Sequence, residues 1–180
     1  MSRRDDLWHE LAHLVGPLGP FTTPRQRRHA ERELLAGLDA SSLDDLLGIL
    51  ADVGDPRVPV PDRAGFESLL QDAVAAAGRD RGAEVVRRVV PLLDDPMVRP
   101  CAIDLLGLVP VDDAVAALDH LVRHTALTDD ELERAACSLG ELGGTRATAT
   151  LAWLRDQDVV PSVAAEVDLA LRAAAREGRG

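Results

Sequence analysis

The sequence predicts an all-α protein in which antiparallel helix pairs stack on one another as an α-solenoid. Apolar residues recur at three- and four-residue spacing along nearly the whole chain of 180 residues, as they do on the buried face of a helix. Stretches in which apolar and polar residues alternate, which would indicate strands, are missing. Helix pairs of similar size repeat with a period near 33 residues, which is typical of stacked helical repeats. We therefore expect one domain over residues 1–180.

Residues 1–61 predict a less regular helical part. Leucines at helical spacing mark the first helix: Leu7, Leu11 and Leu14. Thr23 followed by Pro24 predicts the N-cap and the first residue of a second helix, because proline is tolerated where no helical hydrogen bond is donated. Ser41 or Ser42 is expected to cap the third helix.

The remaining chain predicts one long loop and seven helices. The loop covers residues 52–62, where three prolines disfavour continued helix. The helices expected beyond the loop cover residues 63–78, 82–93, 97–108, 112–124, 129–142, 145–155 and 161–176. The repeats are clearest over residues 82–176.

A shift of 33 residues superposes the two clearest repeats. It places Leu106 on Leu139 and Gly107 on Gly140. A single helix pair cannot cover its own apolar stripe, so neighbouring pairs have to stack. Leu106 and Leu139 are therefore expected at equivalent positions in the core.

These repeats resemble the HEAT-repeat family, in particular the short HEAT-like repeats found in phycobilisome lyases. In the best copy the resemblance is carried by Asp95-Pro96, Val98-Arg99, Ala102 and Leu106-Gly107. In the next copy it is carried by Asp130, Ala135 and the residues from Leu139 to Gly143. The resemblance implies a curved stack whose first helices lie on the convex side and whose second helices line the concave face. It implies a scaffold for binding, with no shared reaction.

The charge of the chain narrows the class of partner. The chain has 31 acidic and 20 basic residues, a formal net charge of −11, and only 2% aromatic residues. Nucleic-acid binding depends on clustered cationic side chains and often on aromatic stacking, so we expect no nucleic-acid partner. A protein partner with a basic or neutral surface is expected instead.

The distribution of apolar and charged residues predicts the cellular location of the protein. No apolar run approaches the roughly 20 residues of a membrane span, and the chain starts with the charged segment MSRRDDLWHE. We expect a cytoplasmic protein without membrane contact. Arginine is used to the exclusion of lysine, which we interpret as the coding bias of a GC-rich bacterial genome. Cys101 and Cys137 lie in apolar helical runs and are expected to be buried.

Residues 9–13 read His-Glu-Leu-Ala-His, which matches the HEXXH pattern of zinc proteases. On a helix His9 and His13 lie one turn apart, Glu10 has the place of the general base, and Glu33 has the spacing of a third ligand. The residues around Glu33 do not continue the pattern, and eight residues before His9 leave no room for a substrate-holding strand. We interpret the match as fortuitous and expect no catalytic residue, no metal and no cofactor.

Two further polar groups have both a functional and a structural interpretation. Positive charge is concentrated in one segment of the chain, at Arg25, Arg27, Arg28 and Arg32. It suits phosphate contact, but ion pairing with Glu31 and Glu33 on a solvated helix is the simpler expectation. His120 and His124, with Asp119 nearby, suit weak metal binding. We expect instead that His124 complements the dipole at a helix C-terminus.

The repeat alignment also predicts a partner-binding row. It places Arg88, His120 and Trp153 at equivalent positions on three successive second helices. The candidate partner-binding residues are Arg87, Arg88, Asp119, His120, Arg123 and Trp153. The residue that comes directly after each member of the row in the sequence is expected to face the core: Val89, Leu121 and Leu154. Tryptophan and arginine are enriched at binding hot spots, although Trp153 packed half-buried against the last helix is the structural alternative.

The sequence therefore predicts a non-catalytic protein-binding module that recognises a macromolecular partner through its concave face. An adaptor, a regulator and an antidote to a toxin all fit this description. The alternative is an enzyme, either a zinc-dependent hydrolase acting through His9, His13 and Glu33 or a lyase or chaperone-like HEAT protein.

Overall fold

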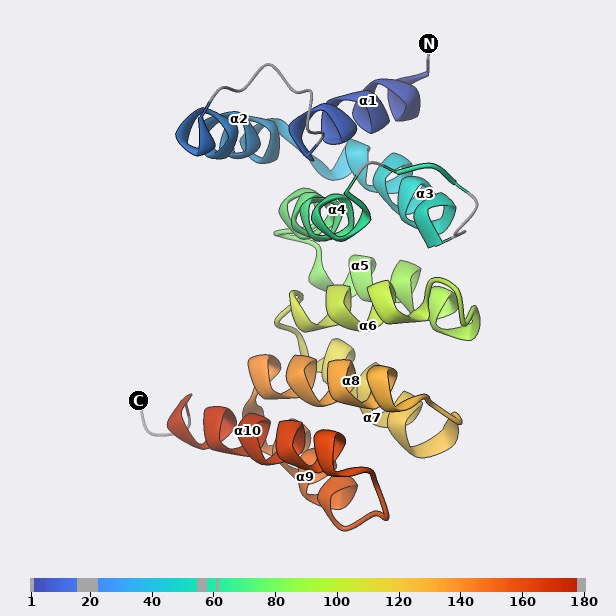
Figure 1. Cartoon of the computed structure of the whole chain (residues 1–180), viewed down its shortest axis with the longest axis vertical. Helices are drawn as coiled ribbons and strands as arrows, with labels where there is room; N and C mark the ends of the chain where they lie inside the picture. The colour runs from blue at the N-terminus through green and yellow to red at the C-terminus, as the bar shows by residue number, and fades with distance from the viewer. Residues whose placement is uncertain (1, 16–22, 55–57, 61, 178–180) are drawn as a thin grey trace. The chain divides into compact units, whose positions relative to one another are not determined.

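The computed structural model describes residues 2–15, 23–54, 58–60 and 62–177. The regular secondary structure of these residues consists of ten α-helices and two 3-10 helices, which confirms the all-α class (Figure 1). None of the described helices is both long enough and apolar enough to cross a lipid bilayer. The chain divides into two compact units, with the boundary between Arg81 and Gly82.

The first unit contains four α-helices and a 3-10 helix. They are α1 (Arg3–Val15), α2 (Pro24–Gly37), η1 (Ala40–Ser42), α3 (Leu43–Gly54) and α4 (Arg63–Ala77). The predicted start of α2 is confirmed: Thr23 and Gln26 form a reciprocal capping box, and Pro24 begins the helix. Helix α1 packs against α3 and α4, and the ring of Trp8 lies 5.1 Å from that of Phe66.

The serines expected to cap the third helix lie directly before α3, and the expected loop after α3 begins later than predicted. Ser41 and Ser42 lie in the 3-10 helix η1, where the Ser41 amide donates to Asp39 and the Ser42 hydroxyl accepts from Arg3. Helix α3 continues to Gly54, so the first part of the expected loop 52–62 is helical. The first proline of the loop is residue 56, and Val53 is fully buried, so packing holds the last turn in place. Residues 55–57 and 61 of that loop lie outside the described residues.

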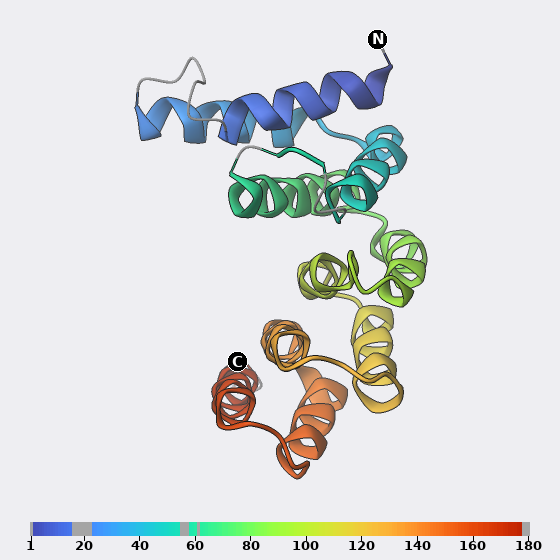
Figure 2. The same cartoon turned by 45° about the vertical axis from the view of Figure 1, so that its right-hand side comes forward.

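The second unit contains six α-helices in two rows. They are α5 (Gly82–Val89), α6 (Arg99–Gly107), α7 (Asp112–His124), α8 (Asp129–Leu142), α9 (Gly144–Arg155) and α10 (Pro161–Glu177), with the 3-10 helix η2 (Val90–Asp94) after α5. Helices α6, α8 and α10 pack side by side in one row, and α5, α7 and α9 form the other (Figure 2). The first row has the more extensive packing.

Prolines explain where two helices of this unit differ from expectation. The helix expected over 82–93 ends at Val89, because Pro91 cannot donate the next helical hydrogen bond and the chain tightens into η2. The helix expected over 97–108 begins at Arg99, with Pro100 in its first turn, where proline is tolerated.

The predicted core positions are buried. Leu106 and Leu139 have no exposed surface, and Val89, Leu121 and Leu154 are at most 3% exposed. Cys101 is buried as expected, but the expectation for Cys137 is wrong, because this residue is exposed. Its neighbours at i−4 and i+4 are glutamates, which marks its side of α8 as polar.

Two glycines allow the close approach of α6, α8 and α10. A Cβ atom added to Gly107 would lie 2.7 Å from the Ser138 hydroxyl and 3.1 Å from the Ser138 backbone. One added to Gly140 would lie 2.8 Å from the Cβ atom and 3.0 Å from the Cα atom of Ala170. These glycines are the equivalent residues of the sequence repeat, so each repeat uses the same position for helix contact.

A buried ion pair joins α6 to α8. The Arg99 guanidinium lies 3.1 Å from Glu131, and the two side chains are 10% and 5% exposed. Arg99 also donates to the Leu93 carbonyl over 2.6 Å. The second carboxylate oxygen of Glu131 accepts from the amide and the hydroxyl of Thr128 and so caps α8. No buried side-chain nitrogen or oxygen atom of the described residues, those of this pair included, lacks a hydrogen-bond partner, which buried charges require.

We predict that Gly140→Ala lowers the free energy of unfolding by about 1 kcal/mol or more. Overpacking costs about 1–3 kcal/mol, and the gain in helix propensity of roughly 1 kcal/mol only partly offsets it. The control is Gly37→Ala, where no atom lies within 4 Å of an added Cβ atom. Denaturant unfolding measures both, and equal stability of the two variants contradicts the close packing of α8 on α10.

We predict that Glu131→Gln lowers the free energy of unfolding by about 3–5 kcal/mol, because it leaves the buried Arg99 charge unpaired while an amide still caps α8. Glu133→Gln on the same helix is the control and should have little effect. The double variant Arg99→Met/Glu131→Gln should recover much of the loss. A Glu131→Gln variant as stable as the wild type is the opposing result.

Candidate functional site

Asp119 on α7 is the centre of a polar cluster that extends to α9. Its Oδ1 atom accepts from Arg123 Nε over 2.6 Å and from the Thr150 hydroxyl over 2.7 Å. Its Oδ2 atom accepts from Arg146 Nη2 over 3.1 Å. The Asp119 side chain is 17% exposed, whereas that of Arg146 is 58% exposed. One carboxylate therefore positions two arginines at the surface.

The electrostatics of Asp119 reflect these contacts. Burial by itself would raise the pKa of the carboxyl group, but the hydrogen bonds from Arg123, Thr150 and Arg146 outweigh burial and lower the pKa to about 2. Asp119 is accordingly ionised at neutral pH. Two guanidinium groups share this single negative charge, so the cluster keeps a net positive charge within an acidic protein.

Arg123 also covers the indole ring of Trp153. Its Cζ atom lies 4.5 Å from the ring centroid, in cation–π geometry. Trp153 is half-buried, and this contact is made by α7 and not by the last helix. The Arg123 side chain is held at one end by Asp119 and rests on the ring along its face, so its terminal nitrogens have a defined position. The residues Asp119, Arg123, Arg146, Thr150 and Trp153 are called the α7–α9 cluster below.

Helical spacing explains how the cluster forms. Asp119 and Arg123 are four residues apart on α7 and share one face. Arg146, Thr150 and Trp153 follow the same spacing on α9, and buried Thr150 brings that face against α7. Arg146 and Thr150 were not among the residues predicted from the sequence. Their i, i+4, i+7 spacing with Trp153 indicates that the three residues share one face of α9. The sequence of one helix does not indicate which other helix that face contacts.

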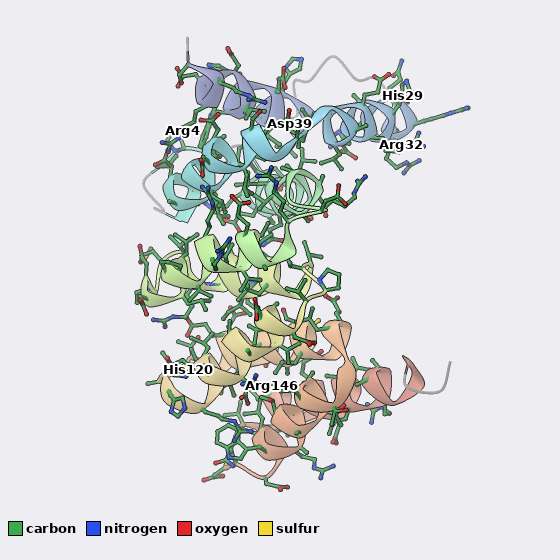
Figure 3. The ribbon with its side chains drawn as sticks, turned by 180° about the vertical axis from the view of Figure 1, so that it is seen from behind. Arg4, His29, Arg32, Asp39, His120 and Arg146 are labelled. Carbon is green, nitrogen blue, oxygen red and sulfur yellow. The ribbon has the colours of Figure 1, made fainter. Side chains whose placement is uncertain are left out.

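The structure brings three of the six predicted partner-binding residues together: Asp119, Arg123 and Trp153. His120 is exposed next to the cluster, with its ring 4.6 Å from that of His124, and Figure 3 shows it on α7. Arg87 and Arg88 are exposed on α5, where Arg88 lies 3.1 Å from Glu84. These two arginines belong to another helix surface and have no described contact with the cluster.

The HEXXH match on α1 does not acquire its third ligand. His9 and His13 are both exposed, and Glu33 on α2 lies 3.4 Å from His29. His13 and Glu10 line a cavity of about 270 Å³ whose other lining residues, Leu14, Ala30 and Leu34, are apolar. No group of three or more histidine, cysteine or acidic side chains is placed to hold a metal ion in the part of the chain that the structure describes.

No protein-family model matches the chain, and no curated protein matches it either.

We predict that Asp119→Asn lowers stability at neutral pH and much less in acid. Because folding lowers the pKa of Asp119, the ionised carboxylate stabilises the fold above about pH 4, and this contribution is lost as the pH falls toward about 2. Urea unfolding of the wild type and of Asp119→Asn, from neutral pH down to about pH 2, measures the stability difference. Asp158→Asn, at an exposed position outside the cluster, is the control, and a stability difference that does not change with pH contradicts the prediction.

We also predict that the purified protein carries no stoichiometric zinc and that His13→Ala leaves its stability unchanged. Two exposed histidines without a third ligand hold zinc weakly. Elemental analysis after dialysis against a weak chelator measures the metal. Zinc near one equivalent that is lost in His13→Ala would show that the HEXXH motif is a metal site.

Proposed function

We propose that this protein is a non-catalytic protein-binding module, built as a HEAT-like α-solenoid that acts in the cytoplasm as an adaptor, regulator or antidote-type partner. The two rows of helices in the second unit support the architecture. The glycines that set the helix approach recur one repeat apart, at Gly107 and Gly140, which is what repeated stacking requires.

The observation that carries the binding proposal is the α7–α9 cluster. Arginine and tryptophan are the residues most enriched at binding hot spots, and here Asp119 and Trp153 hold Arg123 in place before any partner arrives. A side chain that is already ordered loses less conformational entropy on binding. A cluster of this kind is more than a solvated ion pair, because it combines two fixed guanidinium groups with an aromatic surface.

The packing of the two helix rows indicates whether the α7–α9 cluster lies on the convex or the concave side of the stack. The row α6, α8 and α10 approaches more closely than the row α5, α7 and α9, and a stack bends toward its more closely packed row. This favours a convex position for the α7–α9 cluster, whereas the HEAT resemblance implies a concave position for the second helices. We therefore base the proposal on the cluster itself and not on the direction of curvature.

The charges favour a partner of mixed character. The net charge of −11 favours a surface that is basic or neutral as a whole. Arg123 and Arg146 favour an acidic or hydrogen-bond-accepting group at the point that contacts the cluster. Such a partner would be complementary both to the net negative charge of the whole chain and to the local positive charge of the cluster.

The test is the affinity of the partner recovered by co-purification from the native host. We expect Trp153→Ala to weaken its binding by about 2 kcal/mol, roughly 30-fold, and Arg146→Ala to weaken it in the same direction. Arg172→Ala, an exposed position on α10, is the matched control for loss of one arginine. Arg88→Glu tests whether the surface extends to α5.

Isothermal titration calorimetry measures affinity, and thermal unfolding of each variant separates binding from stability. Trp153→Ala and Arg146→Ala variants that fold and bind as the wild type does would exclude the cluster as the binding surface.

A further inference from the structure

Helix α2 carries four arginines that no described carboxylate neutralises: Arg25, Arg27, Arg28 and Arg32. The expected ion pairs with Glu31 and Glu33 are not formed, and Glu33 instead contacts His29. The sequence of residues 16–22, which precede the helix, contains no acidic residue. Most other arginines do have a carboxylate partner: Arg3, Arg4, Arg63, Arg88, Arg99, Arg123, Arg134, Arg146 and Arg155. Unpaired cationic charge gathered on one helix is exceptional in so acidic a chain.

Two of the four arginines line a concave site. Arg25 and Arg32 border a cavity of about 360 Å³ together with Thr23, Gln26 and His29. Arg25, His29 and Arg32 are spaced i, i+4, i+7 and therefore lie on one face of α2. His29 and Arg32 both extend from this helix (Figure 3). The lining residues that the structure describes all have polar or charged side chains, so the site offers hydrogen-bond donors to an anionic group.

The donors of this site are its side chains and not the N-terminus of the helix. The capping box already engages the amides of Thr23 and Gln26. Arg32 Nε donates to the Arg28 carbonyl over 3.2 Å, which leaves its two terminal nitrogens for a ligand. No hydrogen bond or ion pair of the Arg25 guanidinium group is found among the described residues, and Glu33 lies against His29.

We propose that the cavity formed by Thr23, Arg25, Gln26, His29 and Arg32 binds a phosphate monoester. A monoester is close to a dianion at neutral pH and presents three acceptor oxygens, which suits a cavity lined by two guanidinium groups. A phosphodiester has a single charge and fewer free oxygens. Because the two guanidinium groups are the charged donors of this site, the phosphate itself is the recognised group. A free phosphate ester and a phosphorylated side chain of another protein present this same chemistry.

The proposal is tested by titrating the full chain with inorganic phosphate, followed by the amide and His29 ring resonances in NMR spectra. The pH is held near 7.5, where phosphate is mostly dianionic, and sodium chloride keeps the ionic strength constant. The double variant Arg25→Gln/Arg32→Gln removes the lining arginines. The double variant Arg27→Gln/Arg28→Gln makes the same change of charge on the same helix outside the cavity. A phosphoserine peptide, its unphosphorylated form and a short single-stranded oligonucleotide complete the set of probes.

We expect saturable shifts of the α2 resonances in the wild type. Affinity should fall at least about tenfold in Arg25→Gln/Arg32→Gln and stay within about twofold in Arg27→Gln/Arg28→Gln, since one lost charge-assisted hydrogen bond corresponds to about a factor of ten. A phosphopeptide that binds more tightly than inorganic phosphate identifies a phosphorylated side chain as the ligand, and equal affinities identify a free ester. Shifts that do not saturate, equal loss in the two double variants, or saturable binding of the oligonucleotide alone would each overturn the proposal. None of these results bears on the α7–α9 cluster.

Discussion

The second unit depends on the buried pair of Arg99 and Glu131. Arg99 fixes the end of η2 through the Leu93 carbonyl, and Glu131 fixes the start of α8 through Thr128. The ion pair between them therefore sets the position of one repeat against the next. Buried ion pairs contribute little net stability compared with apolar residues, but removing only one partner is strongly destabilising because it leaves the other charge buried and unpaired. Loss of one partner therefore costs more stability than the intact pair contributes.

The two rows of the second unit use different kinds of residue. Glycine and alanine bring α6, α8 and α10 together, so that row gains stability from close backbone approach. Helices α7 and α9 meet through long polar side chains around Asp119. Such contacts leave functional groups at the surface, because a guanidinium group that is hydrogen-bonded through one nitrogen still has others to offer. Close backbone packing and exposed polar groups are in this way found in opposite rows.

Periodicity was enough to predict the helices, the buried leucines and the capping threonine of α2. It did not predict where α5 ends, because the effect of Pro91 on its own helix competes with an apolar pattern that continues to Leu93. In the α7–α9 cluster, the pair of Asp119 and Arg123 follows from spacing along one helix. Arg146 does not, because its contact with Asp119 depends on how α9 packs on α7. The expected pairing of the arginines on α2 with Glu31 and Glu33 is not found in the described residues, and Glu33 contacts His29 instead.

The two tryptophans of the chain are divided between the two units. Trp8 lies against Phe66 in the first unit, and Trp153 lies beneath Arg123 in the second. Indole emission depends on solvent exposure and on nearby charge, and these two rings differ in both their neighbours and their surroundings. The chain therefore contains one intrinsic fluorophore per unit, so that replacing either tryptophan with phenylalanine leaves an optical reporter of the other unit alone. Whether the two units unfold together or in separate steps can thus be followed without any attached dye.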